Sequence, residues 1–125
     1  MTRSLAAVSY LVRDYDEAID WFLRCLGFVV VEDTLLAGDK RWVVMAAPGL
    51  GGARLVLARV SEVLPAAGGR VAFFLHTDDF DRDFTAMLAA GVTFREVPRQ
   101  ESYGTVAVFE DLYGNGWDLI EPKSA

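Results

Sequence analysis

The sequence contains one cysteine, Cys25, and one histidine, His76. A lone cysteine allows no intrachain disulfide and no thiolate metal cluster, so nothing requires an oxidising compartment and we expect the protein in the cytoplasm. No apolar run approaches the roughly 20 residues that a membrane-spanning helix needs. Basic residues are also scarce: 12 Lys and Arg stand against 18 Asp and Glu, a net charge of −6. This balance argues against nucleic acid or an acidic membrane surface as a partner, because binding phosphates needs clustered positive charge.

What the chain does contain is a repeat. Val8-Ser9-Tyr10-Leu11-Val12-Arg13-Asp14 is echoed by Val71-Ala72-Phe73-Phe74-Leu75-His76-Thr77-Asp78, and each Asp is followed at the same spacing (27 − 14 and 91 − 78) by Gly27 or Gly91. Later, Arg54-Leu55-Val56 corresponds to Asp118-Leu119-Ile120 at an offset of 64 (118 − 54). A copy of about 60 residues is marginal alone, so the two copies are predicted to be modules of one fold.

The length of 125 residues and the 53% hydrophobic content predict a single domain over residues 1–125. Module one is expected at about 5–60 and module two at about 70–122, joined by a connector containing Pro and Gly at 61–69. Asp14 and Glu17 have capping-box spacing, which predicts a helix at about 15–26 that Gly27 ends. The other expected elements are strands at 5–12, 28–31, 41–47, 54–60, 70–76, 92–97, 105–110 and 117–121, and a helix at about 79–90.

The expected order is therefore βαβββ, twice. This predicts an α+β fold in which two paired βαβββ modules form a curved mixed sheet around an open cup. The concave surface where two such sheets meet is the place to look for a ligand site.

Several of these segments resemble the vicinal oxygen chelate superfamily, which includes glyoxalase I, bleomycin-resistance proteins, fosfomycin-resistance enzymes and extradiol dioxygenases. The resemblance rests on Val12-Arg13-Asp14-Tyr15-Asp16, on Trp21-Phe22 with Leu26-Gly27-Phe28, and on Phe109-Glu110-Asp111-Leu112-Tyr113-Gly114-Asn115-Gly116-Trp117-Asp118-Leu119-Ile120-Glu121-Pro122. It covers essentially the whole chain. These motifs belong to the scaffold of the superfamily rather than to one activity, so the resemblance specifies the fold more closely than the function.

The resemblance also implies where a metal would bind. Metal-dependent members take one ligand, His or Glu, from the first and last strand of each module, and these positions fall on Ala7, Arg54, Arg70 and Asp118. Only Asp118 can bind a cation, because alanine has no donor atom and guanidinium is permanently positive. A register shift of one residue brings in no ligand either. We therefore expect no metal at the family position and no cofactor.

Two interpretations of Arg54, Arg70 and Asp118 remain open. In the first, Asp118 forms a salt bridge with one or both arginines and fills the space of the missing metal, so that Asp118→Ala would destabilise the fold. In the second, the arginines bind an anionic ligand through bidentate hydrogen bonds. The two interpretations are compatible, since one arginine can pair with Asp118 while the other binds.

His76 has the same strand parity as Arg70, which would place it at the cup. It is either a rim histidine paired with neighbouring acids or a general acid–base at the cavity mouth. Strand parity and the expected loops also bring aromatic residues towards the cup, among them Trp42, Phe74 and Tyr103, although core packing is a common fate for such residues.

The sequence thus predicts a glyoxalase-like or bleomycin-resistance-like protein that binds a small organic ligand, anionic in the second interpretation of the arginines, without the family-type metal site. The resemblance further implies a homodimer whose loops complete the cup. The alternative is a lyase, isomerase or dioxygenase-like enzyme that uses metal-free acid–base chemistry or an unconventional metal site. A structural or regulatory interaction module is a third possibility. The identity of the ligand is not encoded in any of these motifs.

Overall fold

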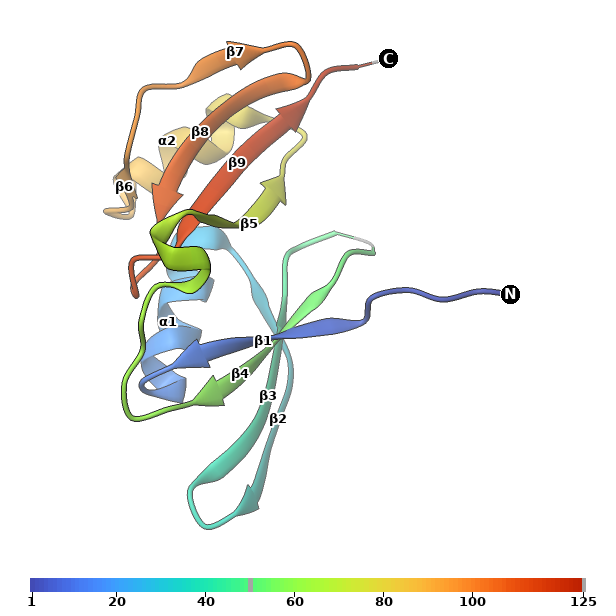
Figure 1. Cartoon of the computed structure of the whole chain (residues 1–125), viewed down its shortest axis with the longest axis vertical. Helices are drawn as coiled ribbons and strands as arrows, with labels where there is room; N and C mark the ends of the chain where they lie inside the picture. The colour runs from blue at the N-terminus through green and yellow to red at the C-terminus, as the bar shows by residue number, and fades with distance from the viewer. Residues whose placement is uncertain (50, 125) are drawn as a thin grey trace. The chain divides into compact units, whose positions relative to one another are not determined.

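The computed structural model describes residues 1–49 and 51–124, and its contacts divide the chain into two units, Met1–Val63 and Leu64–Ala125. The elements, shown in Figure 1, are β1 (Ala7–Val12), α1 (Tyr15–Leu26), β2 (Val29–Ala37), β3 (Lys40–Ala46), β4 (Arg54–Arg59), the 3₁₀ helix η1 (Ala66–Gly69), β5 (Val71–His76), α2 (Phe80–Ala89), β6 (Thr93–Phe94), β7 (Arg99–Glu101), β8 (Gly104–Glu110) and β9 (Gly116–Pro122). Each unit is a mixed sheet with one helix, so the α+β class is confirmed. Across the described part of the chain, no helix is long and apolar enough to cross a bilayer.

The first unit has the strand order β1-β4-β3-β2. β1 and β4 pair in parallel, whereas β3 is antiparallel to both of its neighbours. The β3–β4 pairing covers only Val43 to Met45, so the hairpin of β2 and β3 extends past the end of β4 (Figure 1). β2 is longer than the strand expected at 28–31 because its pairing with β3 continues through Ala37.

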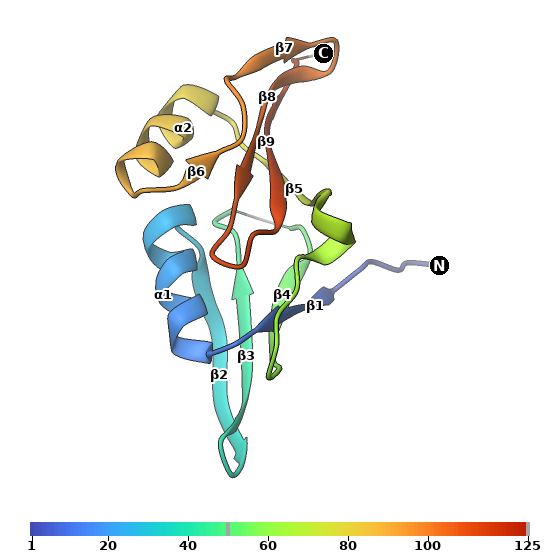
Figure 2. The same ribbon diagram turned by 60° about the vertical axis from the view of Figure 1, so that its left-hand side comes forward.

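Helix α1 has the predicted bounds, and its caps explain them. The Asp14 carboxylate accepts a hydrogen bond from the backbone N–H of Glu17, and Gly27 ends the helix with a φ of 65°, a conformation that costs little only for glycine. Ala18 and Phe22 are fully buried on the inner stripe, and the Phe22 ring packs edge-on against Tyr10 of β1 at 5.1 Å. Figure 2 shows α1 lying along one side of this sheet.

The second unit repeats the topology with the order β5-β9-β8-β6, and β7 also pairs with β8. In both units the first strand (β1 or β5) lies beside the last (β4 or β9), which is followed by β3 or β8 and then by β2 or β6. The predicted duplication of strand order is therefore confirmed. Two elements were not predicted: η1 lies in the expected connector, and the strand expected at 92–97 is reduced to β6 and followed by β7.

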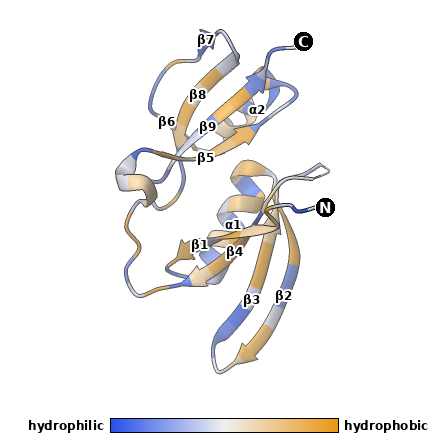
Figure 3. Ribbon diagram, turned by 45° about the vertical axis from the view of Figure 1, so that its right-hand side comes forward, coloured by the Kyte–Doolittle hydropathy of each residue, from blue (hydrophilic) through white to orange (hydrophobic). Residues whose placement is uncertain are grey.

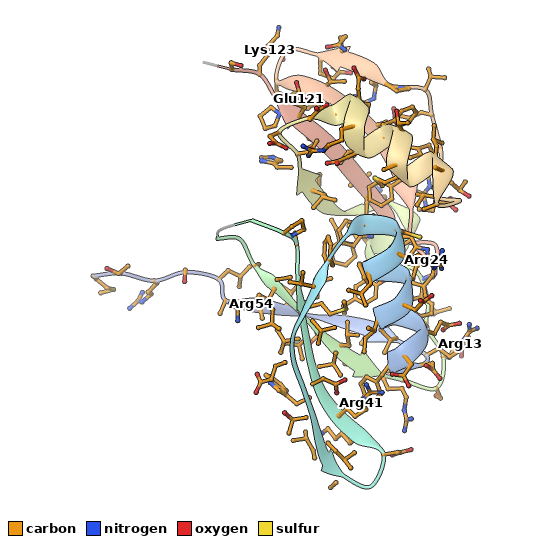
Figure 4. The ribbon with its side chains drawn as sticks, turned by 180° about the vertical axis from the view of Figure 1, so that it is seen from behind. Arg13, Arg24, Arg41, Arg54, Glu121 and Lys123 are labelled. Carbon is orange, nitrogen blue, oxygen red and sulfur yellow. The ribbon has the colours of Figure 1, made fainter. Side chains whose placement is uncertain are left out.

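The residue that caps the start of α2 also differs from the one that the repeat suggested. The N-cap of α2 is Asp79, which accepts from the backbone N–H of Arg82 at 3.1 Å, whereas the repeat suggested Asp78 as the counterpart of Asp14. The carboxylate of Glu121 in β9, a residue labelled in Figure 4, further accepts a hydrogen bond from the backbone N–H of Phe80 at 2.8 Å, so the sheet itself holds the start of this helix.

The turn between β8 and β9 is organised by Asp111, which is 6% exposed. Its carboxylate accepts hydrogen bonds from the backbone N–H of Tyr113, from the backbone and side-chain N–H groups of Asn115, and from Nε1 of Trp117. The Asn115 side-chain oxygen in turn accepts from the N–H of Ala66 at 2.6 Å. The Asp-x-x-Gly-Asn-x-Trp motif is therefore a structural device that fixes β9 in register.

Candidate functional site

Asp118 lies in the middle of β9, the strand that β5 and β8 flank. Its neighbours Trp117 and Leu119 are buried in the aromatic and aliphatic core, so the strand alternation places Asp118 on the opposite face of the sheet from these two residues. The residue is nevertheless only 8% exposed, and its Oδ1 has no hydrogen-bond partner within residues 1–49 and 51–124. Burial raises the pKa of Asp118; the charge of Arg99 opposes this rise, and the charge of Glu96 adds to it.

The cation that affects Asp118 electrostatically is thus Arg99 of β7, which the sequence analysis did not select. Its guanidinium is already engaged: Nε donates to Glu96 Oε2 at 2.7 Å, and Nη1 donates to Glu101 Oε1 at 2.6 Å. These two carboxylates, with a smaller contribution from Tyr103, raise the pKa of Arg99. Arg99-Gln100-Glu101 contains no apolar residue, so no hydrophobic alternation in the sequence could reveal this short strand.

Phe74 and His76 of β5 share the parity of Asp118. Phe74 stands directly opposite Asp118 in the parallel pairing and is 65% exposed, and exposed His76 stands opposite Ile120. Tyr103, in the turn between β7 and β8, is 50% exposed. The second unit therefore brings Asp118, Phe74 and His76 onto neighbouring strands.

Arg70 differs from its predicted place. It lies immediately before β5 and four residues ahead of Phe74, the residue that occupies the position opposite Asp118. Four residues of strand span about 13 Å. The Asp118–Arg70 ion pair is accordingly absent, and in the described residues the exposed Arg70 guanidinium has no ion-pair partner.

In the first unit, the corresponding pair of positions is Ala7 and Arg54, which face each other across β1 and β4. The exposed Arg54 side chain, labelled at the start of β4 in Figure 4, has no ion-pair partner in residues 1–49 and 51–63. Leu55 and Leu57 are buried in the core, so Arg54 and Val56 lie on the other face of this sheet. The predicted pairing of Arg54 with Asp118 joins the two units and stays a prediction.

Trp42 lies on the same face as Arg54, at the far end of the sheet. It is 40% exposed, and its Nε1 donates to Glu32 Oε2 at 2.8 Å.

Where β3 separates from β4, a groove of about 640 Å³ opens. It is lined by Tyr15, Leu36, Lys40, Arg41, Trp42, Val56, Leu57, Ala58 and Arg59.

The positive charges of this groove are largely compensated. Arg41, labelled in Figure 4, donates to Asp16 at 2.9 Å and to Asp33 at 2.7 Å, and Arg59 donates to Asp39 at 2.5 Å. The Arg41 guanidinium keeps the pKa of Asp33 below its ordinary value. Both arginines also lie over the Tyr15 ring, and they form part of the wall of the groove. Because each is paired with carboxylates, they leave little net charge in it.

The residues at the four family positions do not fit a metal. Asp118 is the one ligand-type side chain among them, and the residue opposite it in β5, Phe74, has no donor atom. Within the part of the chain that the structure describes, no three His, Cys, Asp or Glu side chains gather in an arrangement that could hold an ion. Three protein ligands are usual even at an open catalytic zinc site.

Comparison with known proteins agrees with this architecture. The model of the Glyoxalase/Bleomycin resistance protein/Dioxygenase superfamily matches residues 4–119, and the chain belongs to this superfamily. A protein of Shewanella frigidimarina (strain NCIMB 400) is 49% identical over 128 residues, covering 97% of this chain and 95% of the relative.

Two solved structures illustrate the similarity of fold. The crystal structure of UcmS2 is 28% identical with a TM-score of 0.83, covering 97% of this chain and 99% of that one. TnmS3, an antibiotic binding protein from Streptomyces sp. CB03234, is 28% identical with a TM-score of 0.73 and covers 98% of this chain and 99% of its own.

Proposed function

We propose that the protein binds a small organic ligand in a cup formed by both units of a single domain, without the family-type metal site. The observation that carries the proposal is the chemistry of the four family positions: a lone carboxylate, Asp118, accompanies Ala7, Arg54 and Arg70. The similarity to TnmS3, an antibiotic binding protein, supports ligand binding as a function of this scaffold.

Part of the ligand is anionic in this proposal, and Arg54 and Arg70 recognise it. Both side chains are exposed, and neither guanidinium has an ion pair within the described part of its own unit, so their hydrogen-bond donors are available. A planar guanidinium can bind a carboxylate or phosphate in a bidentate manner. Phe74, Trp42, Tyr103 and His76 are proposed to line the cup.

Metal analysis and a thermal-shift screen test this proposal together. We expect no stoichiometric transition metal and an increase in Tm with organic acids, because a ligand that binds only the native state stabilises it. Zinc, nickel, iron or manganese bound through Asp118 would contradict the metal-free site and favour the enzyme alternative.

Arginine variants sharpen this test. Arg54→Ala and Arg70→Ala should each reduce the affinity for an acidic ligand by about 10-fold or more, since a hydrogen bond to a charged group contributes about 1.5–3 kcal/mol. Arg3→Ala is the matched control, because it removes an exposed cation outside every strand and helix. Stabilisation by neutral compounds alone would eliminate the anion site and leave an apolar binding cup.

The protein is further proposed to be a cytoplasmic homodimer. The edge strand β2 exposes a row of apolar residues that a second copy would cover, visible as orange stretches in Figure 3. They are Val29, Val30, Val31, Leu35 and Leu36. Light scattering after size exclusion should give twice the mass of the chain, and Leu35→Lys should give the monomer; a monomeric wild type would refute the dimer.

A further inference from the structure

Asp118 is a buried acid to which the fold gives no structural task. Asp118 is more than nine-tenths buried, yet its Oδ1 accepts no hydrogen bond from the part of the chain that the structure describes. Buried carboxylates are rarely left in this condition, because an unsatisfied charged group pays its desolvation cost without return. Such an oxygen, on the sheet face that lacks the helix, indicates a partner from outside the second unit, and a bound ligand can supply it.

The surroundings of Asp118 restrict what that partner can be. The nearest influential cation, Arg99, already donates to Glu96 and Glu101, so this part of the sheet holds more carboxylates than cations. A second anion placed against Asp118 would be repelled. The partner is therefore not the anionic group that the exposed arginines would bind.

A metal ion is an equally poor partner. The side chains in register with Asp118 on the two neighbouring strands are Phe74 and Val108, and neither has a donor atom. What an isolated carboxylate oxygen accepts well is an N–H or O–H group. Phe74, exposed and directly opposite, adds apolar surface on which a flat ring can lie.

We propose that the part of the ligand that binds the second unit is a planar apolar group with an N–H or O–H donor, which Asp118 Oδ1 accepts while the ring contacts Phe74. This inference rests on the proposed small-molecule function and narrows its ligand class. The molecule is an aromatic amide, amine or phenol at this end. Any acidic group that it carries lies apart from Asp118 and is left to the arginines.

A fragment screen with matched pairs tests the donor assignment. Each donor-bearing aromatic fragment is included together with its N- or O-methylated analogue, for example 2-naphthol with 2-methoxynaphthalene and 2-naphthamide with its N,N-dimethyl form. Affinities are measured by titration of ¹H–¹⁵N NMR spectra. The donor-bearing members should bind about 10-fold more tightly than their methylated partners, with shifted resonances in β5 and β9.

Three variants assign the effect to Asp118. Asp118→Ala should abolish the preference for donors, and Asp118→Asn, which keeps an acceptor oxygen, should retain part of it. Asp81→Asn removes an equal charge from the exposed surface of α2 and should leave the preference unchanged. Because Asp118→Asn preserves the side-chain shape, it keeps the test valid if the alanine variant folds poorly.

The outcomes separate the inference from the function on which it rests. Fragments that bind equally well in both members of a pair, or whose preference survives Asp118→Ala, would overturn the role of Asp118 while small-molecule binding stands. A library from which nothing binds would overturn the proposed function itself. Donor-dependent binding lost with Asp118 establishes both.

Discussion

Two buried aspartates lie seven residues apart in the second unit and have opposite surroundings. Asp111, 6% exposed, accepts from the N–H groups of Tyr113, Asn115 and Trp117 at 2.9–3.0 Å. Asp118, 8% exposed, leaves one carboxylate oxygen without a partner. Burial is nearly equal, so it does not distinguish them. The hydrogen bonds do: the satisfied acid stabilises the fold, and the unsatisfied one is where we propose that a ligand donor binds.

The strongest test of this contrast is Asp111→Ala. It leaves several buried donors unpaired, so we expect the free energy of unfolding to fall by about 3 kcal/mol or more. Urea denaturation followed by circular dichroism measures this loss. A change of less than about 1 kcal/mol would show that the turn holds itself without the carboxylate.

Trp117→Phe tests one bond of the same network. The substitution removes the Nε1 donor to Asp111 and part of a ring that packs against Phe73 at 4.7 Å. We expect a loss of about 1–2 kcal/mol in the same urea experiment. Trp21→Phe on α1 is the control, because Trp21 is only partly buried. If this variant lost as much free energy of unfolding, the smaller ring, and not the lost hydrogen bond to Asp111, would explain the result for Trp117→Phe.

Asp118→Asn should change stability in the other direction. It removes a buried charge that has no compensating bond, and we expect a gain on the order of 1 kcal/mol at pH 7. The sequence-based expectation that Asp118→Ala destabilises the fold assumed an arginine partner, and the structure provides none from Arg70. A loss of stability in Asp118→Asn would indicate that a cation stabilises the charged carboxylate.

The pH dependence of the same variant fixes the cause. Burial raises the pKa of Asp118 above its ordinary value of 3.8, so the folded state binds the proton more tightly than the unfolded state does. The loss of stability caused by burying the charged carboxylate is therefore largest above the pKa of the folded state, and it decreases as the pH falls through that pKa. The advantage of Asp118→Asn in Tm should therefore shrink towards pH 4, and an advantage independent of pH would point to packing instead.

The smallest expected effect concerns an exposed aspartate with one bond. Asp79→Ala removes the N-cap of α2 and should cost about 1 kcal/mol. Asp78→Ala, which removes only a surface pair with Arg82, should cost less than half of that. Thermal unfolding of the two variants compares them, and the reverse order would restore Asp78 as the counterpart of Asp14.

Local signals predicted much of the fold. Helix α1 was placed correctly because its cap, apolar stripe and terminal glycine all lie within a few residues of sequence. The strands at 93–94 and 99–101 were less accessible, because β6 is very short and Arg99–Glu101 has no apolar alternation. Their pairing with β8 is a tertiary contact that overrides local preference.

The site was predictable in outline only. The motif selected Asp118 and strand parity selected Phe74, and the structure places these two residues opposite each other on β9 and β5. The predicted proximity of Arg70 and Asp118 depended on the register of β5 against β9. The structure has a register shift between Val71 and Phe73, and Phe74 is the residue opposite Asp118. The cluster of Glu96, Arg99 and Glu101 depends on the course of β7, which no local pattern encodes.

The parallel strand pairs, β1 with β4 and β5 with β9, constrain the order in which each unit can fold. Ala7 pairs with Arg54 and Val71 with Gly116, residues 47 and 45 positions apart (54 − 7 and 116 − 71). Closing chain segments of this length costs entropy before any stabilising contact forms, whereas the helices and hairpins form from residues that are near neighbours in the sequence. We therefore expect each sheet to close last, at its first strand. On the ribosome, β1 stays without its partner until β4 has been synthesised and has left the exit tunnel.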